Sequence, residues 1–456
     1  MRRALMVVIA SSLVIGACRV GPNYKRPDIA APPQFRGDIT GAPSPASLGD
    51  VKWFELFKDE KLQMLIKKAF ESSYDVKIAA ARVLEARGTL KATRSGLFPQ
   101  IGVGASANRQ GLGGSAISTA LAAGQAAWEI DLFGKLRRAT EAAQAEMLAT
   151  EANQLAVRQT LVSDVAAAYF RLLEADRQLE VAREALNTRE VSLKLVSARN
   201  TGGIGTQLEE DQSRSLVASA AGEIAIAERD IEQTENFINL LLGQDPGPVE
   251  RGNMLTAQIM PPQVPAGLPS SLLERRPDLR AAEQVLVAAN ARIGVAKAAF
   301  FPSITLTGGG GYQSFELSNV VNRAGGLYNY GAAIDLPIFD AGRRVGNYNA
   351  AKARQEQMLN SYLYSLRNAF REVADALVGV RKSREYRQQQ EIFASTLRNQ
   401  SRLSNLRYTG GVTSYLEVLD SERQHLSAEQ SLAEAQRDEL ISAVTLYKVL
   451  GGGWQQ

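Results

Sequence analysis

The amino-acid sequence predicts a mainly α-helical chain that carries membrane β-strands and an internal duplication. Three observations support this fold class. Short motifs recur in the same order at a spacing of about 200 residues, the mark of a repeated unit. Low-charge segments in each half alternate apolar and polar residues with period two, as β-strands do. Two long stretches contain almost no glycine or proline, which is typical of extended helices.

The composition limits the chemistry open to the chain. Its 52 basic and 48 acidic residues give a net charge of +4, which is too balanced for a nucleic-acid-binding protein. A single histidine, His425, and a single cysteine, Cys18, exclude most zinc, haem and iron–sulfur sites, which need several such ligands. No nucleophile-elbow motif accompanies the histidine. We therefore expect no catalytic residue, no metal site and no cofactor, and interpret the chain as a non-enzyme.

Residues 1–17 are predicted to form a lipoprotein signal peptide. A basic start is followed by an apolar run that is shorter than the roughly 20 residues of a membrane span. The run ends in Val14-Ile15-Gly16-Ala17-Cys18, which resembles a bacterial lipobox with Cys18 as the lipidated residue. The alternative is a plain signal peptide with an incidental cysteine. The next residue is not the aspartate that favours inner-membrane retention, so the outer membrane is indicated. The proline-rich residues 18–60 are predicted to form a lipid-anchored strap.

The duplication gives each half the same succession of elements. A helical segment, 61–97 or 271–300, is followed by a low-charge stretch, 98–133 or 301–340, and then by a charged helical stretch, 134–243 or 341–450. Residues 244–270 link the halves and 451–456 form a C-terminal tail. The recurring motifs are Phe98-Pro99 and Phe301-Pro302, Ile130-Asp131-Leu132 and Ile334-Asp335-Leu336, Thr201-Gly202-Gly203 and Thr409-Gly410-Gly411, and Leu242-Gly243 and Leu450-Gly451.

The two low-charge stretches are predicted to be membrane β-hairpins. In the second, Tyr328, Tyr330 and Ile334 alternate with Asn329 and Gly331, a pattern typical of membrane strands. A soluble hairpin with one buried face is the alternative, and the lipid anchor favours membrane strands. Four strands cannot close a barrel, because membrane barrels have no open edges and start at about eight strands. Copies of the chain must therefore share strands, with eight from two copies or twelve from three.

The charged helical stretches are predicted to be long helical hairpins. No glycine or proline occurs from Lys135 to Thr201, and a helix of about 65 residues is roughly 100 Å long. Such a length indicates a coiled-coil-like assembly. A Thr-Gly-Gly tip reverses the chain in each half, since glycine readily adopts the left-handed conformation that ends a helix.

These motifs together resemble the TolC family of outer-membrane efflux channels, in its lipoprotein type. The similarity covers nearly the whole chain after the signal peptide. It includes Gly21-Pro22-Asn23-Tyr24-Lys25-Arg26-Pro27 and Glu274-Arg275-Arg276-Pro277-Asp278-Leu279, besides both Phe-Pro strand starts and both tips. The resemblance implies a homotrimer with a 12-stranded outer-membrane barrel and a periplasmic tunnel of 12 helices. It also implies an equatorial belt, to which the strap, the linker 244–270 and the tail would contribute.

The resemblance also implies two functional regions at the tips. Glu417 and Asp420 match acidic rings that narrow a periplasmic aperture, and Tyr408 matches an aromatic residue of its closed-state lock. Thr413 stands where some relatives carry a lock arginine, so the closed state must be held differently here. For the two acids, a solvated helix face is the alternative. The residues that match the adaptor-contacting motif are Gly203, Ile204, Gly205, Thr206, Gly411, Val412, Thr413 and Ser414, although an ordinary glycine-terminated turn would have the same composition.

The function implied by this resemblance is a passive exit duct in the outer membrane that extends into the periplasm. An inner-membrane pump and a periplasmic adaptor protein would load it with drugs or other small toxic compounds, and no nucleic acid is expected as a partner. One alternative is the outer-membrane duct of a type I protein-secretion system. A second, from another class, is a structural helical lipoprotein without transport.

Overall fold

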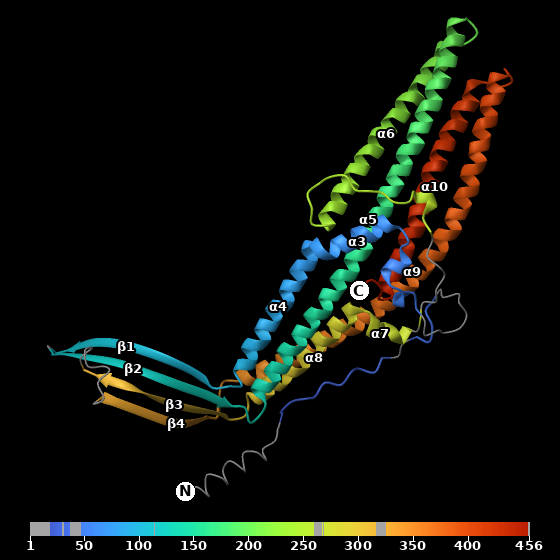
Figure 1. Ribbon diagram of the computed structural model, residues 1–456. Helices are drawn as coiled ribbons and strands as arrows, with labels where there is room; N and C mark the ends of the chain where they lie inside the picture. The colour runs from blue at the N-terminus through green and yellow to red at the C-terminus, as the bar shows by residue number, and fades with distance from the viewer. Residues whose placement is uncertain are drawn as a thin grey trace. The chain divides into compact units, whose positions relative to one another are not determined.

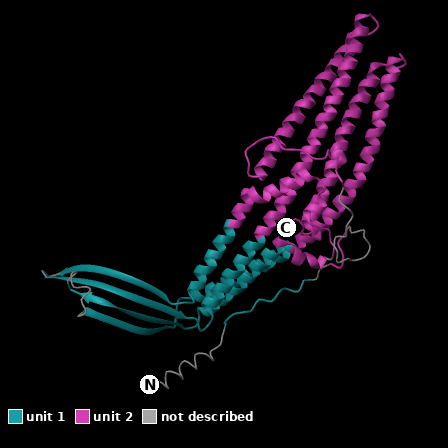
Figure 2. Cartoon of the chain, viewed as in Figure 1, with its two compact units in different colours: residues 1–29, 81–152, 279–365 teal, residues 30–80, 153–278, 366–456 magenta. Residues whose placement is uncertain are grey.

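The computed structural model describes residues 19–29, 32–36, 47–113, 115–259, 267, 269–315 and 325–454. Cys18 lies outside these residues. Figure 1 shows the course of the chain, which divides into two compact units (Figure 2). Unit 1 comprises 1–29, 81–152 and 279–365, and unit 2 comprises 30–80, 153–278 and 366–456.

Unit 1 contains an antiparallel four-stranded sheet with the strand order β1-β2-β3-β4 (Figure 1). The strands are β1 (Gln100–Leu112), β2 (Ser115–Ile130), β3 (Ser303–Ser314) and β4 (Gly326–Asp335). One cross-strand row places Val103 opposite Gly124, then Gly310 and Tyr328. The Tyr328 and Val103 side chains are 82% and 87% exposed, so large apolar groups face outward from both edge strands. The two predicted hairpins are therefore joined in one sheet, whose central pair is β2 and β3.

Helices α4 (Tyr74–Ser95), α5 (Lys135–Thr201), α8 (Pro277–Ala298) and α9 (Arg343–Thr409) contribute residues to unit 1. The contact between α5 and α8 is built from small side chains. Ala142 and Ala145 of α5 pack with Ala288 and Ala291 of α8 in a buried cluster. Alanine has the highest helix propensity, and its small side chain lets these two helices pack closely in an aromatic-poor sequence.

Unit 2 contains the remaining turns of α5 and α9 and their return helices α6 (Gln207–Leu241) and α10 (Tyr415–Val449). Its shorter helices are α2 (Trp53–Leu56), α3 (Glu60–Ser72) and α7 (Leu272–Arg275), with 3-10 turns η1 (Leu48–Asp50), η2 (Leu255–Ala257) and η3 (Pro269–Ser271). In the described part of the chain, no helix is both long enough and apolar enough to cross a membrane.

A buried carboxylate, Asp59, joins three segments of unit 2. It caps α3 through the Lys61 amide at 2.9 Å, and it accepts hydrogen bonds from Tyr169 Oη of α5 at 3.0 Å and from Gln258 Nε2 at 2.8 Å. Burial opposes ionisation, but these bonds and that from the Asn253 amide outweigh it and hold the pKa of Asp59 below its usual value. The linker after α6 is thus fixed against the helical core by a charged group.

The helical segments predicted over 61–97 and 271–300 are each divided into two helices. Ser73 separates α3 from α4 in an extended conformation, and the Ser72 hydroxyl donates to the Leu242 carbonyl at 2.6 Å. Arg276 separates α7 from α8, because a residue that precedes proline disfavours the helical conformation, and Pro277 follows it.

Candidate functional site

The two hairpin tips have the same backbone design. Gly203 and Gly411 have φ values of 74° and 73°, the left-handed region that favours glycine. The amide of Ile204 returns to the Arg199 carbonyl at 3.0 Å, and the amide of Val412 returns to the Arg407 carbonyl at 2.9 Å. These bonds satisfy the last carbonyls of α5 and α9 as in a Schellman motif. The Thr-Gly-Gly signal therefore ends both helices in the same way.

Each tip exposes two large apolar side chains. Ile204 and Leu208 are 73% and 67% exposed at the first tip, and Val412 and Leu416 are 72% and 65% exposed at the second. Among the other predicted tip residues, Gly203, Thr206, Gly411 and Ser414 are exposed, while Gly205 and Thr413 are half-buried. Exposed aliphatic groups beside glycines form a surface that can be covered by another protein.

Glu417 is held in place within its own hairpin. One oxygen accepts a hydrogen bond from Thr413 Oγ1 at 2.5 Å, and the other lies 3.3 Å from Arg407 Nε of α9. Asp420, one turn further along α10, accepts hydrogen bonds from Arg423 at 3.0 Å and Gln424 at 2.6 Å. Both carboxylates remain partly exposed, so they present negative charge to solvent while fixed in orientation.

Tyr408 lies behind these acids rather than beside them on the surface. Its ring is 5% exposed and packs 5.1 Å from the ring of Tyr415, in a buried cluster with Val196 and Val418. The guanidinium of Arg199 lies 4.7 Å from the centre of the Tyr408 ring, within cation–π range. We call these four buried side chains the tip cluster. It joins α5 of the first hairpin to α9 and α10 of the second.

Sequence reasoning missed both arginines at the tips. Arg199 and Arg407 occupy equivalent positions in the two repeats, one on the Tyr408 ring and the other beside Glu417. Extending the repeat comparison backwards from the two Thr-Gly-Gly motifs would have paired them. Their different partners could not be deduced, because an arginine near the end of a helix is usually solvated.

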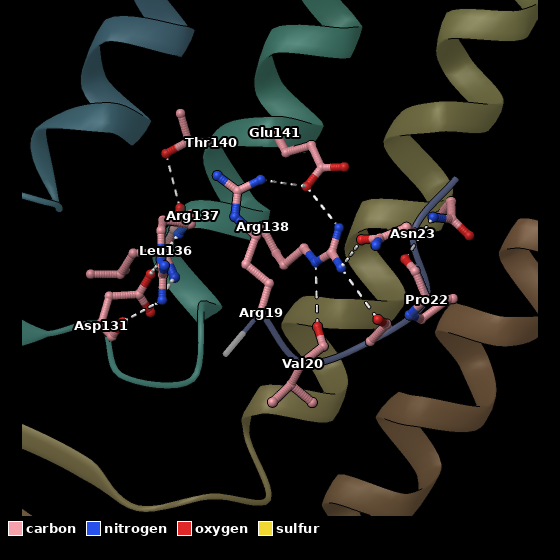
Figure 3. A network of polar contacts seen from close by, with 12 residues as sticks. Arg19, Val20, Pro22, Asn23, Asp131, Leu136, Arg137, Arg138, Thr140 and Glu141 are labelled. Atoms are coloured by element: carbon pink, nitrogen blue, oxygen red, sulfur yellow. Dashed lines mark hydrogen bonds and ion pairs between the residues drawn. The ribbon is translucent and has the colours of Figure 1, made fainter. Parts of the chain in front are cut away.

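A second polar network binds the segment that follows Cys18 (Figure 3). Arg138, near the start of α5, is 1% exposed. Its guanidinium donates to the carbonyls of Val20 and Gly21 at 3.3 and 3.2 Å and to Asn23 Oδ1 at 2.8 Å. Glu141 balances its charge at 2.9 Å. The strap is therefore bound to unit 1 from its first described residues.

Close backbone contact completes this docking. Gly21 has a φ of +100°, and a Cβ on it would lie 2.5 Å from the Gly294 Cα of α8. Further along the strap, the Glu283 carboxylate of α8 accepts hydrogen bonds from Tyr24 Oη at 3.1 Å and from both sides of the Arg26 guanidinium, at 2.9 and 2.5 Å. The Pro22 carbonyl accepts a hydrogen bond from Asn290 Nδ2 of α8 at 3.0 Å, so each residue of the Gly-Pro-Asn-Tyr sequence has a defined partner or space.

Comparison with known proteins places the chain among channels. The family model described as outer membrane efflux protein matches residues 65–244 and 268–452. The chain is 35% identical over 449 residues to the cation efflux system protein CusC of Escherichia coli O6:H1, with 98% of each chain covered. It is 36% identical over 459 residues to the toluene efflux pump outer membrane protein TtgI of Pseudomonas putida, with 97% of each covered. The open-state crystal structure of the MtrE outer membrane channel of Neisseria gonorrhoeae superimposes with a TM-score of 0.87 at 33% identity, covering 96% of this chain and 99% of that one.

Proposed function

The chain belongs to the outer membrane efflux protein family, and from this premise we propose that it is the exit duct of a tripartite system for small toxic compounds. It is an outer-membrane efflux channel, and the fold class and family predicted from the sequence are confirmed. The family consists of channel proteins rather than enzymes. One relative is named for cation efflux and another for toluene efflux, and we infer that the pump selects the cargo while the duct accepts what it delivers.

The observation that supports the duct most strongly is the pair of open sheet edges. In the described residues, β1 and β4 each have one neighbouring strand, and in lipid every backbone N–H and C=O on the free side would lack a partner. Three copies that pair edge to edge close a barrel of twelve strands and satisfy these groups. Conductance in planar bilayers separates this duct from a structural rod, which would pass no current.

The trimer gives a direct prediction. Native mass spectrometry of the full-length protein in mild detergent should report three chains, because a single four-stranded sheet cannot satisfy its edges in a membrane. A stable folded monomer that inserts into membranes on its own would contradict shared strands.

Lipidation of Cys18 gives another prediction. The described strap begins one residue later, and its Val20 amide donates to the Phe133 carbonyl, in the turn before α5, at 3.2 Å. The first described residues of the strap are therefore held beside the β2–α5 turn. Intact-mass measurement should show cleavage before Cys18 plus the mass of the acyl chains. A mature chain that begins elsewhere, or an unmodified thiol, would rule this out, and Cys18→Ser should weaken anchoring while the barrel still holds the protein in the membrane.

The aperture and the tips receive separate roles in this proposal. Glu417 and Asp420 line the periplasmic mouth, and the tip cluster around Tyr408 holds the hairpins together behind them. Thr413 orients Glu417 in place of a lock arginine, and the bond at 2.5 Å supports this role. The exposed Ile204 and Val412, beside their glycines, would contact the periplasmic adaptor, which in turn connects the duct to the inner-membrane pump.

A protein-secretion duct would share this architecture. The docked strap and its lipid anchor favour small-molecule efflux, as do the relatives that the chain resembles over nearly their whole length.

A further inference from the structure

A polar layer lies directly behind the tip cluster, with one member from each of three helices. Glu422 of α10 follows Val418 by one turn, Asn405 of α9 precedes Tyr408 by three residues, and Arg189 of α5 precedes Val196 by two turns. Asn405 Nδ2 donates to Glu422 Oε1 at 3.3 Å. Helices α9 and α10 therefore meet again, through polar side chains, immediately behind the apolar contact, and Arg189 of α5 lines the same cavity as Glu422.

The carboxylate in this layer is incompletely satisfied. Glu422 is 7% exposed, and its Oε2 has no hydrogen-bond partner among the described residues. Burial raises the pKa of Glu422, although the bond from Asn405 and the charges of Arg189 and His425 partly offset it. Arg189 is 3% exposed and donates to the Leu216 carbonyl of α6 at 3.0 Å. Burial lowers the pKa of Arg189, against the attraction of Glu422 and Glu223.

Glu422 and Arg189 face a cavity of about 320 Å³ between α5, α9 and α10. Water occupies about 30 Å³ per molecule, so this space holds several. The other charged groups of its wall are Arg177 and Glu184 of α5, Arg398 of α9, and His425 and Glu429 of α10. Arg177, Arg398 and His425 lie close to Glu429 and balance its negative charge.

Glu429 is a carboxylate of the same cavity whose charge is balanced by neighbouring cations. It is 5% exposed, and it lies 3.4 Å from His425 Nε2 and 3.2 Å from Arg177 Nη2, with an ion pair to Arg398 as well. The histidine and Arg398 lower the pKa of Glu429 to about 2, so it stays ionised over the whole working range. Glu422 has no such set of cations bonded to it and is the carboxylate that can change its charge.

We propose that Glu422, with Asn405 and Arg189, forms a second gating layer that binds protons when the mouth is closed and releases them when it opens. This inference rests on the proposed aperture at the tips. Separation of the tip cluster would open the layer to bulk water, beyond the few molecules that the adjoining cavity holds, and lower the cost of ionising Glu422. A carboxyl group whose affinity for protons is higher in the closed state stabilises that state at low pH. Acid therefore favours the closed mouth, and a rise in pH favours opening.

The test is the open fraction of the full-length channel in planar bilayers between pH 5 and 8. The wild type should open more as pH rises, by up to about tenfold per pH unit for each carboxyl that releases a proton. Glu422→Gln should stay mostly closed with a flat profile. Asp438→Asn is the matched control, because it lies on the same helix with its side chain 54% exposed, and it should keep the wild-type slope.

Two further variants keep the test decisive. Asn405→Ala removes the donor to Glu422, so the midpoint of the profile should move to higher pH even if Glu422→Gln assembles poorly. His425→Asn should keep the slope, and loss of the slope there would assign the sensing to the histidine and overturn the proposal. A wild-type slope in Glu422→Gln would also overturn it, while altered selectivity in aperture variants would leave the proposed function intact. A wild type that passes no current would reject both.

Discussion

Replacement of both Glu417 and Asp420 by alanine should reduce the cation selectivity of the reconstituted channel about fivefold and raise its conductance. The change removes six carboxylates from one narrow opening if three chains form the mouth. It also leaves Arg407 and Arg423 without their partners, at 3.3 and 3.0 Å respectively. The variant therefore loses the negative groups and keeps two arginines per chain whose charges are no longer balanced.

The expected size follows from Coulomb's law. A carboxylate about 10 Å from a passing ion contributes about 0.4 kcal/mol in water. Screening at about 0.1 M salt reduces this nearly threefold at that distance. Six such groups sum to roughly 1 kcal/mol, which corresponds to about fivefold in the partition of a monovalent cation. Block by multivalent cations, which bridge carboxylates, should fall with it.

The repeat supplies the control for this experiment. Glu209 and Gln212 occupy the equivalent positions in the first hairpin, and only one of them is charged. Glu209 is engaged in a capping box with Thr206, its side chain accepting from the Thr206 amide at 3.0 Å. Their double replacement should change selectivity less. If the Glu417 and Asp420 variant keeps wild-type selectivity and divalent block, these acids belong to a solvated outer face.

The second large effect is expected for Arg138→Ala. Its buried guanidinium donates hydrogen bonds to two carbonyls and to Asn23 of the strap, and also to Glu141. Its removal leaves the Val20 and Gly21 carbonyls and Asn23 Oδ1 without their charged donor, and a hydrogen bond to a charged group contributes about 1.5–3 kcal/mol. The strap should therefore detach, with a lower melting temperature and rapid tryptic cleavage after the exposed Lys25.

Arg137→Ala is the matched control. Arg137 is the preceding residue of the same helix turn, yet its side chain bonds to Asp131 and not to the strap (Figure 3). Limited proteolysis of this variant should leave the strap protected. Equal protection of Lys25 in Arg138→Ala and in the wild type would show that the arginine does not hold the strap.

Much of the fold could be predicted because it depends on local patterns. The absence of glycine and proline from Lys135 to Thr201 predicted the extent of α5, and period-two alternation located the four strands. The Thr-Gly-Gly motifs located both helix ends, because only glycine enters the left-handed region without cost. The breaks at Ser73 and Arg276 were missed, although Pro277 gave a usable signal for the second.

The polar interior could not be predicted because its partners are far apart in sequence. Arg138 binds a segment more than a hundred residues away, and in the sequence it is one of several charged residues at a helix start. Glu422 and Glu429 are two acids on one helix, and only the structure shows that the second is paired and the first is not. The partners of each carboxylate, rather than residue type or burial, distinguish them, since the two side chains are 7% and 5% exposed.

The most direct test of the channel assignment is single-channel recording of the wild-type protein under a salt gradient. The account predicts discrete currents of low conductance, with a reversal potential on the cation-selective side that shifts towards zero when Glu417 and Asp420 are replaced by alanine. A trimeric protein that inserts into the bilayer but passes no discrete current would contradict the account and support a structural lipoprotein.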